Sequence, residues 1–206
     1  MKRSLNSEDD TYRTLEVPAE GIFRDRNSRF LAFGFPVSTS EEINSILEGI
    51  RKKYHDARHH CYAYRLGIAK DIYRMNDDGE PSGTAGKPIY GQLVSHDLSD
   101  TLAVVVRYFG GTLLGTGGLI NAYRSATESM LSRATIIDKF VEDHYRICFP
   151  YERLNAVMRI LKDENIVPLH PEYAADCSMH LAIRRSLSVQ VAARLSVIPE
   201  LLLNPV

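Results

Sequence analysis

The sequence predicts an α+β protein built from two domains, and three observations support this prediction. The 206 residues are enough for two separate hydrophobic cores. Apolar residues at helical spacing alternate along the chain with short β-branched or alternating stretches, which is the pattern of mixed helices and strands. The pattern restarts near residues 138–142, so we expect one domain at residues 12–138 and a second at residues 139–206.

The first part of the chain is expected to form three strands, a helix and a fourth strand. Two short strands flank a turn at Pro18, and the third strand ends at Pro36. Thr39 or Ser40 can cap the helix, because a side-chain oxygen accepts a hydrogen bond from the first turn. The fourth strand covers residues 59–66.

The rest of the first domain is expected to contain a loop, a helix, a buried strand and a second helix. Residues 67–86 are polar and predict a loop, and Pro88 suits the first turn of a short helix. The β-branched run at residues 102–106 is typical of a strand that is covered on both faces. A glycine-dense loop at residues 110–118 then leads into the next helix.

The second domain is expected to follow the order of a ferredoxin-like domain, β-α-β-β-α. These five elements fall at residues 145–149, 154–161, 166–173, 179–184 and 189–197. A closing strand would have to come from residues 201–203. At the other end of the chain, residues 1–11 are expected to form a polar lead-in.

Composition excludes several classes of protein. No apolar run approaches the roughly 18 residues that span a bilayer, and the polar, acidic start is unlike a secretory signal, so we expect a cytoplasmic protein and no membrane partner. Cys61, Cys148 and Cys177 are odd in number and widely spaced, which favours reduced thiols over disulfides or a zinc site. The net charge of −1 means that any nucleic-acid contact must come from a local patch.

The densest motif is the segment from Arg107 and Tyr108 through the glycine loop. Five of the 13 glycines fall within nine residues of it: Gly110, Gly111, Gly115, Gly117 and Gly118. A glycine-rich turn between a strand and a helix can present free N–H groups to an anion, and Arg107 could add a bidentate phosphate contact. The alternative is that these glycines only allow close packing, since no P-loop lysine follows them.

A second motif is acidic. Asp77, Asp78 and Glu80 place three carboxylates within four residues, which could hold a divalent cation, although the spacing is not that of an EF-hand. The alternative is a solvated turn, because Asp-Gly and Pro-Ser-Gly, which precedes Thr84, are strong turn formers. Lys87, at the expected helix start, could grip a phosphate or simply lie exposed.

Adjacent histidines open the fourth strand. Strand alternation places His59 and Cys61 on one face and His60, Tyr62 and Tyr64 on the other. The split weakens both a joint metal site and a Cys-His dyad. We therefore expect one buried, hydrogen-bonded histidine and one surface histidine, and we assign no metal.

Local clusters of cations are few. Arg24, Arg26 and Arg29 form one cluster, and residues 51–53 form another. Either can be ordinary solvated surface. With Phe30 and Phe33 nearby, the first cluster could instead contribute to an RNA-facing strand surface.

Four blocks of the sequence, in order, resemble the YigZ/IMPACT family. They fall at residues 27–30, 56–64, 77–88 and 104–123, and the last, VVVRYFGGTLLGTGGLINAY, is the closest match. Arg26 stands where the family usually has lysine. The resemblance implies a first domain with the fold of the second domain of ribosomal protein S5, and a ferredoxin-like second domain similar to the last domain of elongation factor G. It also implies that eukaryotic relatives regulate translation and that two-domain prokaryotic members bind nucleic acid or ribosomes.

The leading hypothesis is a translation-linked regulatory protein that binds RNA, a ribosome or a ribosome-associated partner through its first domain. Its phosphate contacts would come from Arg29, Lys87, Arg107, Tyr108 and the five loop glycines. Two alternatives remain open: an enzyme that holds Mg²⁺ and a phosphorylated or nucleotide substrate, and a module for protein–protein interaction only. A candidate pocket for the enzyme is formed by six residues: His59, His60, Asp77, Asp78, Glu80 and Thr84. No catalytic residue and no cofactor is assigned, and the sequence leaves the oligomeric state open.

Overall fold

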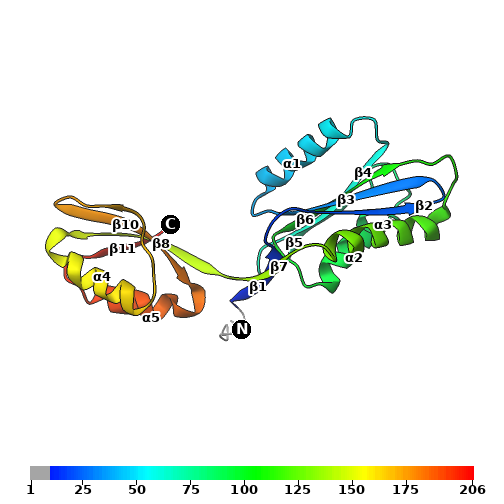
Figure 1. The fold of residues 1–206 in the computed structure, drawn as a ribbon. Helices are drawn as coiled ribbons and strands as arrows, with labels where there is room; N and C mark the ends of the chain where they lie inside the picture. Colours follow the sequence, from blue (N-terminus) through cyan, green and yellow to red (C-terminus); the bar gives the residue numbers. More distant parts are fainter. Residues whose placement is uncertain (1–9) are drawn as a thin grey trace. The chain divides into compact units, whose positions relative to one another are not determined.

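The chain folds into two compact mixed α/β units with antiparallel sheets, seen in a computed structural model that describes residues 10–206 (Figure 1). The first unit comprises residues 12–139, and the second combines residues 140–206 with residues 10 and 11. Among the described residues, every helix is too short or too polar to cross a bilayer.

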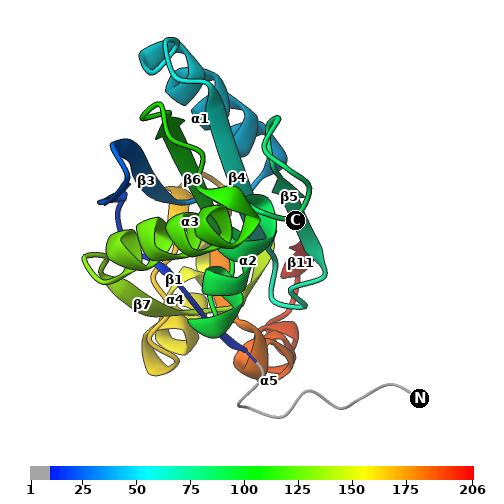
Figure 2. The same cartoon turned by 90° about the vertical axis from the view of Figure 1, so that its right-hand side faces the viewer.

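A five-stranded antiparallel sheet forms the centre of the first unit. Its strands lie in the order β2 (Ala19–Asp25), β3 (Ser28–Pro36), β6 (Thr101–Tyr108), β4 (His59–Leu66) and β5 (Ile72–Asn76). Helices α2 (Gly86–Ser95) and α3 (Gly115–Leu131) cover one face, and α1 (Ser40–Lys53) covers the other (Figures 1 and 2). The sheet is therefore the middle of three layers.

The central strand β6 has a core on each side. Ala103 and Val105 pack with α2 and α3, whereas Leu102, Val104 and Val106 pack toward α1. All five side chains are fully buried. The prediction of a strand covered on both faces is confirmed, because a β-branched run supplies apolar groups to both faces of the pleat.

Local signals also placed the first helix correctly. The Thr39 side chain accepts a hydrogen bond from the Glu42 amide, and α1 begins at the next residue. Its buried residues are Ile43, Leu47 and Ile50, at helical spacing.

Three features differ from the expectations. The expected loop at residues 67–86 contains edge strand β5, whose first four side chains are exposed and therefore lack the alternation of a half-buried strand. Strand β7 (Ile136–Phe140), which pairs with β1 (Thr11–Leu15), was missed for a similar reason. The second half of the glycine-dense loop, Gly115 to Gly118, is the first turn of α3.

The second unit follows the order β-α-β-β-α-β. Its elements are β8 (Glu142–Pro150), the short 3-10 helix η1 (Tyr151–Arg153), α4 (Leu154–Asp163), β9 (Leu169–Glu172), β10 (Asp176–Arg184), α5 (Arg185–Ser196) and β11 (Leu202–Pro205). The sheet order is β11-β8-β10-β9. The closing strand therefore does come from the last residues of the chain, as the sequence required.

Asp10 corrects part of the expectation for the polar lead-in. Its carboxylate is buried and accepts two hydrogen bonds of 2.7 Å from the Arg184 guanidinium, which hold the pKa of Asp10 well below its usual range. The bidentate contact ties this residue to the second unit. The rest of the expected lead-in, residues 1–9, lies outside the described residues.

Candidate phosphate-binding site

Asp77 caps the first turn of α2. Its carboxylate accepts hydrogen bonds of 2.8–2.9 Å from the backbone amides of Gly83, Ala85 and Gly86. A helix start leaves its first amides without internal acceptors, and a carboxylate there also opposes the positive end of the helix dipole. The start of α2 is therefore closed by the protein itself.

Glu80 and Arg107 form a buried ion pair. The carboxylate lies 2.6 Å from the Arg107 guanidinium and 2.7 Å from the Tyr123 hydroxyl, and the two ionised residues are 9% and 5% exposed. Buried charges need such partners. The guanidinium that we expected to contact a phosphate instead neutralises Glu80 inside the fold, because Arg107 shares a sheet face with the buried core residue Val105.

The two histidines lie on opposite faces of β4, as alternation required. His59 Nδ1 lies 2.8 Å from the Asp78 carbonyl oxygen, and His60 is buried with its Nε2 3.0 Å from the Tyr54 carbonyl oxygen. The Asp78 carboxylate accepts a hydrogen bond from the His60 amide and lies 3.7 Å from Arg51. These contacts hold the acidic segment against the strand.

Cys61, on the same strand, and Thr84, the last member of the candidate pocket, are also held by internal contacts. Burial raises the pKa of the Cys61 thiol, which hydrogen-bonds to the Asp77 carbonyl oxygen, so the thiol does not form a reactive dyad with His59. Thr84 is buried and donates to the Pro81 carbonyl oxygen at 2.6 Å. Residues 10–206 contain no group of three or more His, Cys, Asp or Glu side chains arranged to hold a metal ion.

The glycine-dense segment divides into a packed part and an open part. A Cβ on Gly110 would lie 2.1 Å from the Asn27 carbonyl carbon, and the Gly110 amide donates to Ser28 Oγ at 3.1 Å. Glycine is therefore needed at position 110, because the loop backbone approaches the backbone of Asn27 and Ser28 too closely for a side chain. Gly111 and Gly115 have φ angles of +84° and +71°, and Gly117 has no neighbour within 4 Å of an added Cβ.

The start of α3 differs from that of α2 because, within residues 10–206, no carboxylate from elsewhere in the chain accepts hydrogen bonds from its first amides. No side chain caps the helix, and its first turn contains no acidic residue. Gly115, Thr116 and Gly117 are exposed. The amides of this first turn have no internal acceptors, so they form a positive end that faces solvent.

A cationic hairpin lies against the same loop. Arg26 and Asn27, with φ of 43° and 66°, make the two-residue turn between β2 and β3, a conformation typical of a type I′ hairpin turn. Arg24 pairs directly across from Arg29, and Arg29 pairs with Tyr108 of β6, whose ring centroid is 4.5 Å from its guanidinium. Like charges placed opposite one another destabilise a strand pair unless an anion separates them.

These arginines have no acidic partner within hydrogen-bonding distance. Arg24, Arg26 and Arg29 take part in none of the ion pairs formed among residues 10–206. They border a hollow of ≈ 460 Å³ whose lining is completed by Asp25, Asn27, Ser28 and Tyr108. Asp25 is the one acidic residue among the described lining residues. Next to the hollow, the Asp56 carboxylate accepts a hydrogen bond from the Tyr108 hydroxyl at 2.7 Å, which lowers the pKa of Asp56.

The contact of Gly110 with Asn27 and Ser28 joins the hairpin to the glycine loop. We call the combined region the hairpin–loop surface; it comprises residues 24–29, Tyr108 and residues 110–118. Of the residues expected to bind phosphate, Arg29, Tyr108 and the glycines lie on it. Arg107 is buried beneath it, and Lys87 lines a different hollow, between α2 and α3, together with Arg124. Arg124 carried no sequence signal, because a single exposed arginine on a helix is ordinary.

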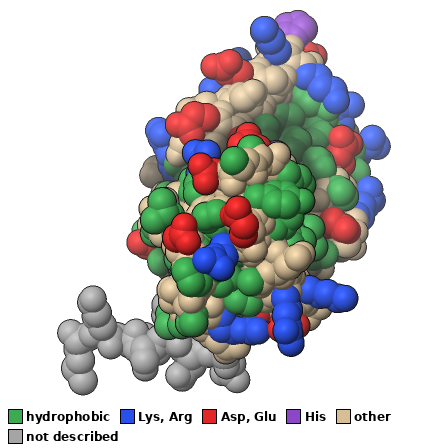
Figure 3. All heavy atoms as spheres, turned by 90° about the vertical axis from the view of Figure 1, so that its left-hand side faces the viewer, with side chains coloured by type: hydrophobic (Ala, Val, Ile, Leu, Met, Phe, Trp, Pro, Cys, Tyr) green, Lys and Arg blue, Asp and Glu red, His purple; other side chains and the backbone are tan. Residues whose placement is uncertain are grey.

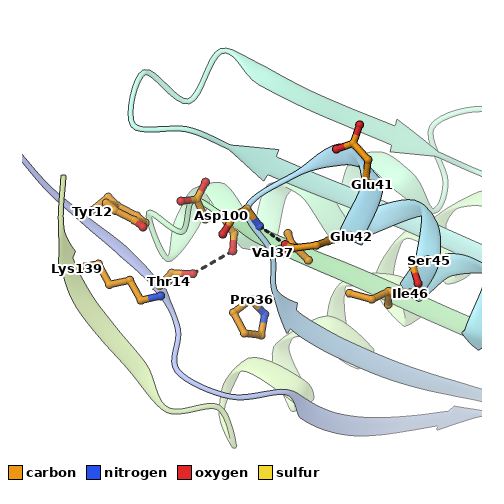
Figure 4. A pocket seen from close by; sticks show the side chains of 11 residues that line it. Tyr12, Thr14, Pro36, Val37, Glu41, Glu42, Ser45, Ile46, Asp100 and Lys139 are labelled. Atoms are coloured by element: carbon orange, nitrogen blue, oxygen red, sulfur yellow. Dashed lines mark hydrogen bonds between the residues drawn. The ribbon is translucent and has the colours of Figure 1, made fainter. Parts of the chain in front are cut away.

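Another hollow, of ≈ 500 Å³, lies beside β1 and the start of α1 (Figure 4). Glu41, Glu42 and Asp100 line it, and Lys139 is the only Lys or Arg among its described lining residues. The Thr14 hydroxyl donates to the Asp100 carbonyl oxygen at 3.0 Å across its floor (Figure 4). Because acidic side chains dominate, this hollow does not favour an anion.

Figure 3 shows one face of the molecule, on which the surface charge is mixed. On the face drawn in Figure 3, acidic and basic side chains are interspersed, with hydrophobic side chains between them. That face shows no continuous field of one sign. The hairpin–loop surface is a local cluster of cations in a protein whose net charge is close to zero.

Comparison with known proteins places the chain in a family. Residues 26–131 match the Impact N-terminal domain. The chain is 33% identical over 182 residues to the IMPACT family member YigZ of Escherichia coli, covering 87% of this chain and 89% of that protein. It is 40% identical over 129 residues to the IMPACT family member YvyE of Bacillus subtilis, covering 63% of this chain and 59% of that protein. A crystal structure described as that of a hypothetical protein superposes with a TM-score of 0.73 at 29% identity, covering 96% and 98% of the two chains. The chain belongs to the IMPACT family.

Proposed function

We propose that this protein is a translation-linked regulator that binds RNA through its hairpin–loop surface. One observation supports the proposal above all: two arginines lie directly opposite each other on an exposed hairpin, beside the start of α3, and within residues 10–206 the arginines have no ion-pair partner and the helix start has no side-chain cap. Each feature attracts anionic oxygens, and the contact of Gly110 with the hairpin turn holds them together.

Aromatic side chains beside the arginines favour RNA over a free phosphate. Tyr108 lies under the Arg29 guanidinium, and the next residue, Phe109, is 41% exposed. Unstacked bases bind to aromatic rings and to guanidinium planes, while phosphates bind to cations and free amides. The hairpin–loop surface offers both kinds of contact within a few residues.

The link to translation comes from family membership. The eukaryotic relatives implied by the resemblance regulate translation, and we extend that role to this chain, with the cytoplasm as its place of action. We also propose that the first unit has the fold of the second domain of ribosomal protein S5. The β-α-β-β-α-β order of the second unit supports a likeness to the last domain of elongation factor G.

A second candidate function is protein–protein interaction through the edge strand β5. Its Ile72, Tyr73 and Met75 side chains are 54%, 51% and 41% exposed, and its outer backbone edge has no partner strand in the sheet. Exposed apolar edge strands accept an added strand from a partner. The alternative of a Mg²⁺-dependent enzyme has less support, because the carboxylates of Asp77 and Glu80 are engaged by three backbone amides and by Arg107 and Tyr123.

The RNA proposal is tested by charge reversal of the opposed arginines. Binding of a single-stranded RNA oligonucleotide would be measured by fluorescence anisotropy at several salt concentrations. We expect R24E/R29E to weaken binding by about tenfold or more and to lower the salt slope by about 2, because each phosphate contact contributes about 1. The matched control is R133E/K139E, which changes the net charge equally at two exposed residues, one beyond the C-terminal end of α3 and one in β7. If R24E/R29E binds RNA as tightly as the parent protein does, the hairpin–loop surface is not the RNA-binding site.

A further inference from the structure

A hollow of ≈ 430 Å³ opens between α2 and α3, outside the hairpin–loop surface. Its volume falls within the range of small-ligand sites, roughly 300–1,000 Å³. The lining residues come from the loop before α2 and from the two helices: Gly83, Lys87, Pro88, Gly91, Gln92, Ile120 and Arg124.

The ionisable groups of this hollow are all cationic. Lys87 and Arg124 line it from α2 and α3, and no carboxylate is among the residues that line it. Both side chains are exposed, and neither takes part in an ion pair within residues 10–206. Two cations that share a hollow repel each other, and an anion between them removes that repulsion.

Gly91 provides a second, independent observation. It lies in the interior of α2, where glycine costs about 1 kcal/mol relative to alanine. Its φ is not positive, and an added Cβ would have no neighbour within 4 Å. By contrast, a Cβ on Gly86 would lie 2.7 Å from the Asn76 amide nitrogen. Neither backbone conformation nor packing requires a glycine at position 91, and the effect of its missing side chain is to keep the hollow open.

We propose that the α2–α3 hollow is a phosphate-binding site. Arg124 would bind two phosphate oxygens through its planar guanidinium, Lys87 would act as a point charge, and the Gln92 amide would donate a further hydrogen bond. The site is separate from the hairpin–loop surface and does not depend on RNA binding there. The phosphate is carried either by a small phosphorylated molecule or by a nucleic-acid strand.

The test adds one charge to the hollow without altering either cation. G91E places a carboxylate beside Lys87 and Arg124, and G91Q is its isosteric neutral control. The full-length variants would be titrated calorimetrically with inorganic phosphate and adenosine monophosphate, and by anisotropy with single-stranded RNA. We expect the affinity of G91E for at least one of these probes to be lower than that of G91Q by about tenfold or more. The new carboxylate would repel the phosphate and would also pair with Lys87 or Arg124.

The probes identify the source of the phosphate. An effect on phosphate or adenosine monophosphate supports a small phosphorylated ligand, and an effect confined to RNA supports a nucleic-acid strand. R124Q should reproduce the same loss, whereas R133Q, which changes one exposed arginine just beyond the end of α3, should leave binding of the probes unchanged. If no probe binds the parent protein, or if G91E and G91Q bind every probe equally, the proposal is overturned. Thermal unfolding should show both variants to be at least as stable as the parent, because they replace a helix-interior glycine and the new Cβ has no described neighbour within 4 Å.

Discussion

Helices α2 and α3 pack against each other, and both follow glycine-containing segments, but their first turns differ. At α2, the Asp77 carboxylate reaches across the loop to the amides of Gly83, Ala85 and Gly86. At α3, no side chain within residues 10–206 accepts hydrogen bonds from the first turn in this way, and neither helix has an acidic residue in its own first turn. One helix start is therefore closed by the protein, and the other presents its first amides to solvent.

This comparison shows that glycine content alone does not identify an anion site. Gly86 is needed because a side chain there would collide with Asn76, and Gly110 is needed because one there would collide with Asn27. Gly117 makes no such contact. The start of α2 is closed by the carboxylate of Asp77, eight residues before Ala85. Within residues 10–206, no equivalent carboxylate contacts the start of α3. The three predictions that follow test this contrast, from the largest expected effect to the smallest.

Removing the partner of Glu80 should have the largest effect. R107A leaves a buried carboxylate without its cation, and we expect the free energy of unfolding to fall by about 3–5 kcal/mol. Urea denaturation measures the change. The double variant R107M/E80Q, which removes both charges, should recover much of the loss. If R107A is as stable as the parent, the ion pair does not hold the acidic segment in place.

Opening the start of α2 should have an intermediate effect. D77A removes the acceptor of three amides, and we expect a loss of about 3 kcal/mol, since hydrogen bonds to a charged group contribute about 1.5–3 kcal/mol each and water replaces some of them. D77N keeps one acceptor oxygen and should lose less. Hydrogen exchange should speed up at the amides of Ala85 and Gly86. Unchanged exchange there would mean that Asp77 does not close the helix.

Alanine substitutions in the glycine-dense segment should show the smallest effects, and G110A in the packed part and G117A in the open part should differ in sign. G110A forces the loop away from the hairpin turn and should cost about 2 kcal/mol, as overpacking does. G117A adds a methyl group to an open position in a helix and should be neutral or stabilising by up to about 1 kcal/mol. Thermal unfolding of the two variants measures both effects. Equal destabilisation by the two alanines would contradict the division into a packed part and an open part.

Much of the fold was predictable because the relevant signals are local. The apolar run in β6, the Thr39 cap and the spacing of Ile43, Leu47 and Ile50 each depend on a few neighbouring residues. The order of elements in the second unit followed from the same kind of pattern. Strand β5 was missed because its first four side chains are exposed, and an exposed edge strand leaves no burial pattern in the sequence.

The candidate site was predictable only in part. Local composition pointed to the glycines, Arg29 and Tyr108, which do lie on the hairpin–loop surface. It could not show that Arg107 turns inward to Glu80, since 27 residues separate the two in the chain. It could not show Arg124 beside Lys87 either, because that hollow exists only where α2 packs against α3.

The sequence by itself determined the mixed α/β architecture, the buried central strand and the Thr39 cap of α1, because hydrophobic periodicity and local capping act over a few residues. The tertiary structure alone decided which charges are available. Arg107 and Asp77 are satisfied by partners far away in the chain, whereas Arg24, Arg29 and the start of α3 have none within the described residues. A charged group is neutralised only if folding brings an opposite charge within about 3–4 Å of it. The order of residues in the sequence does not give that distance.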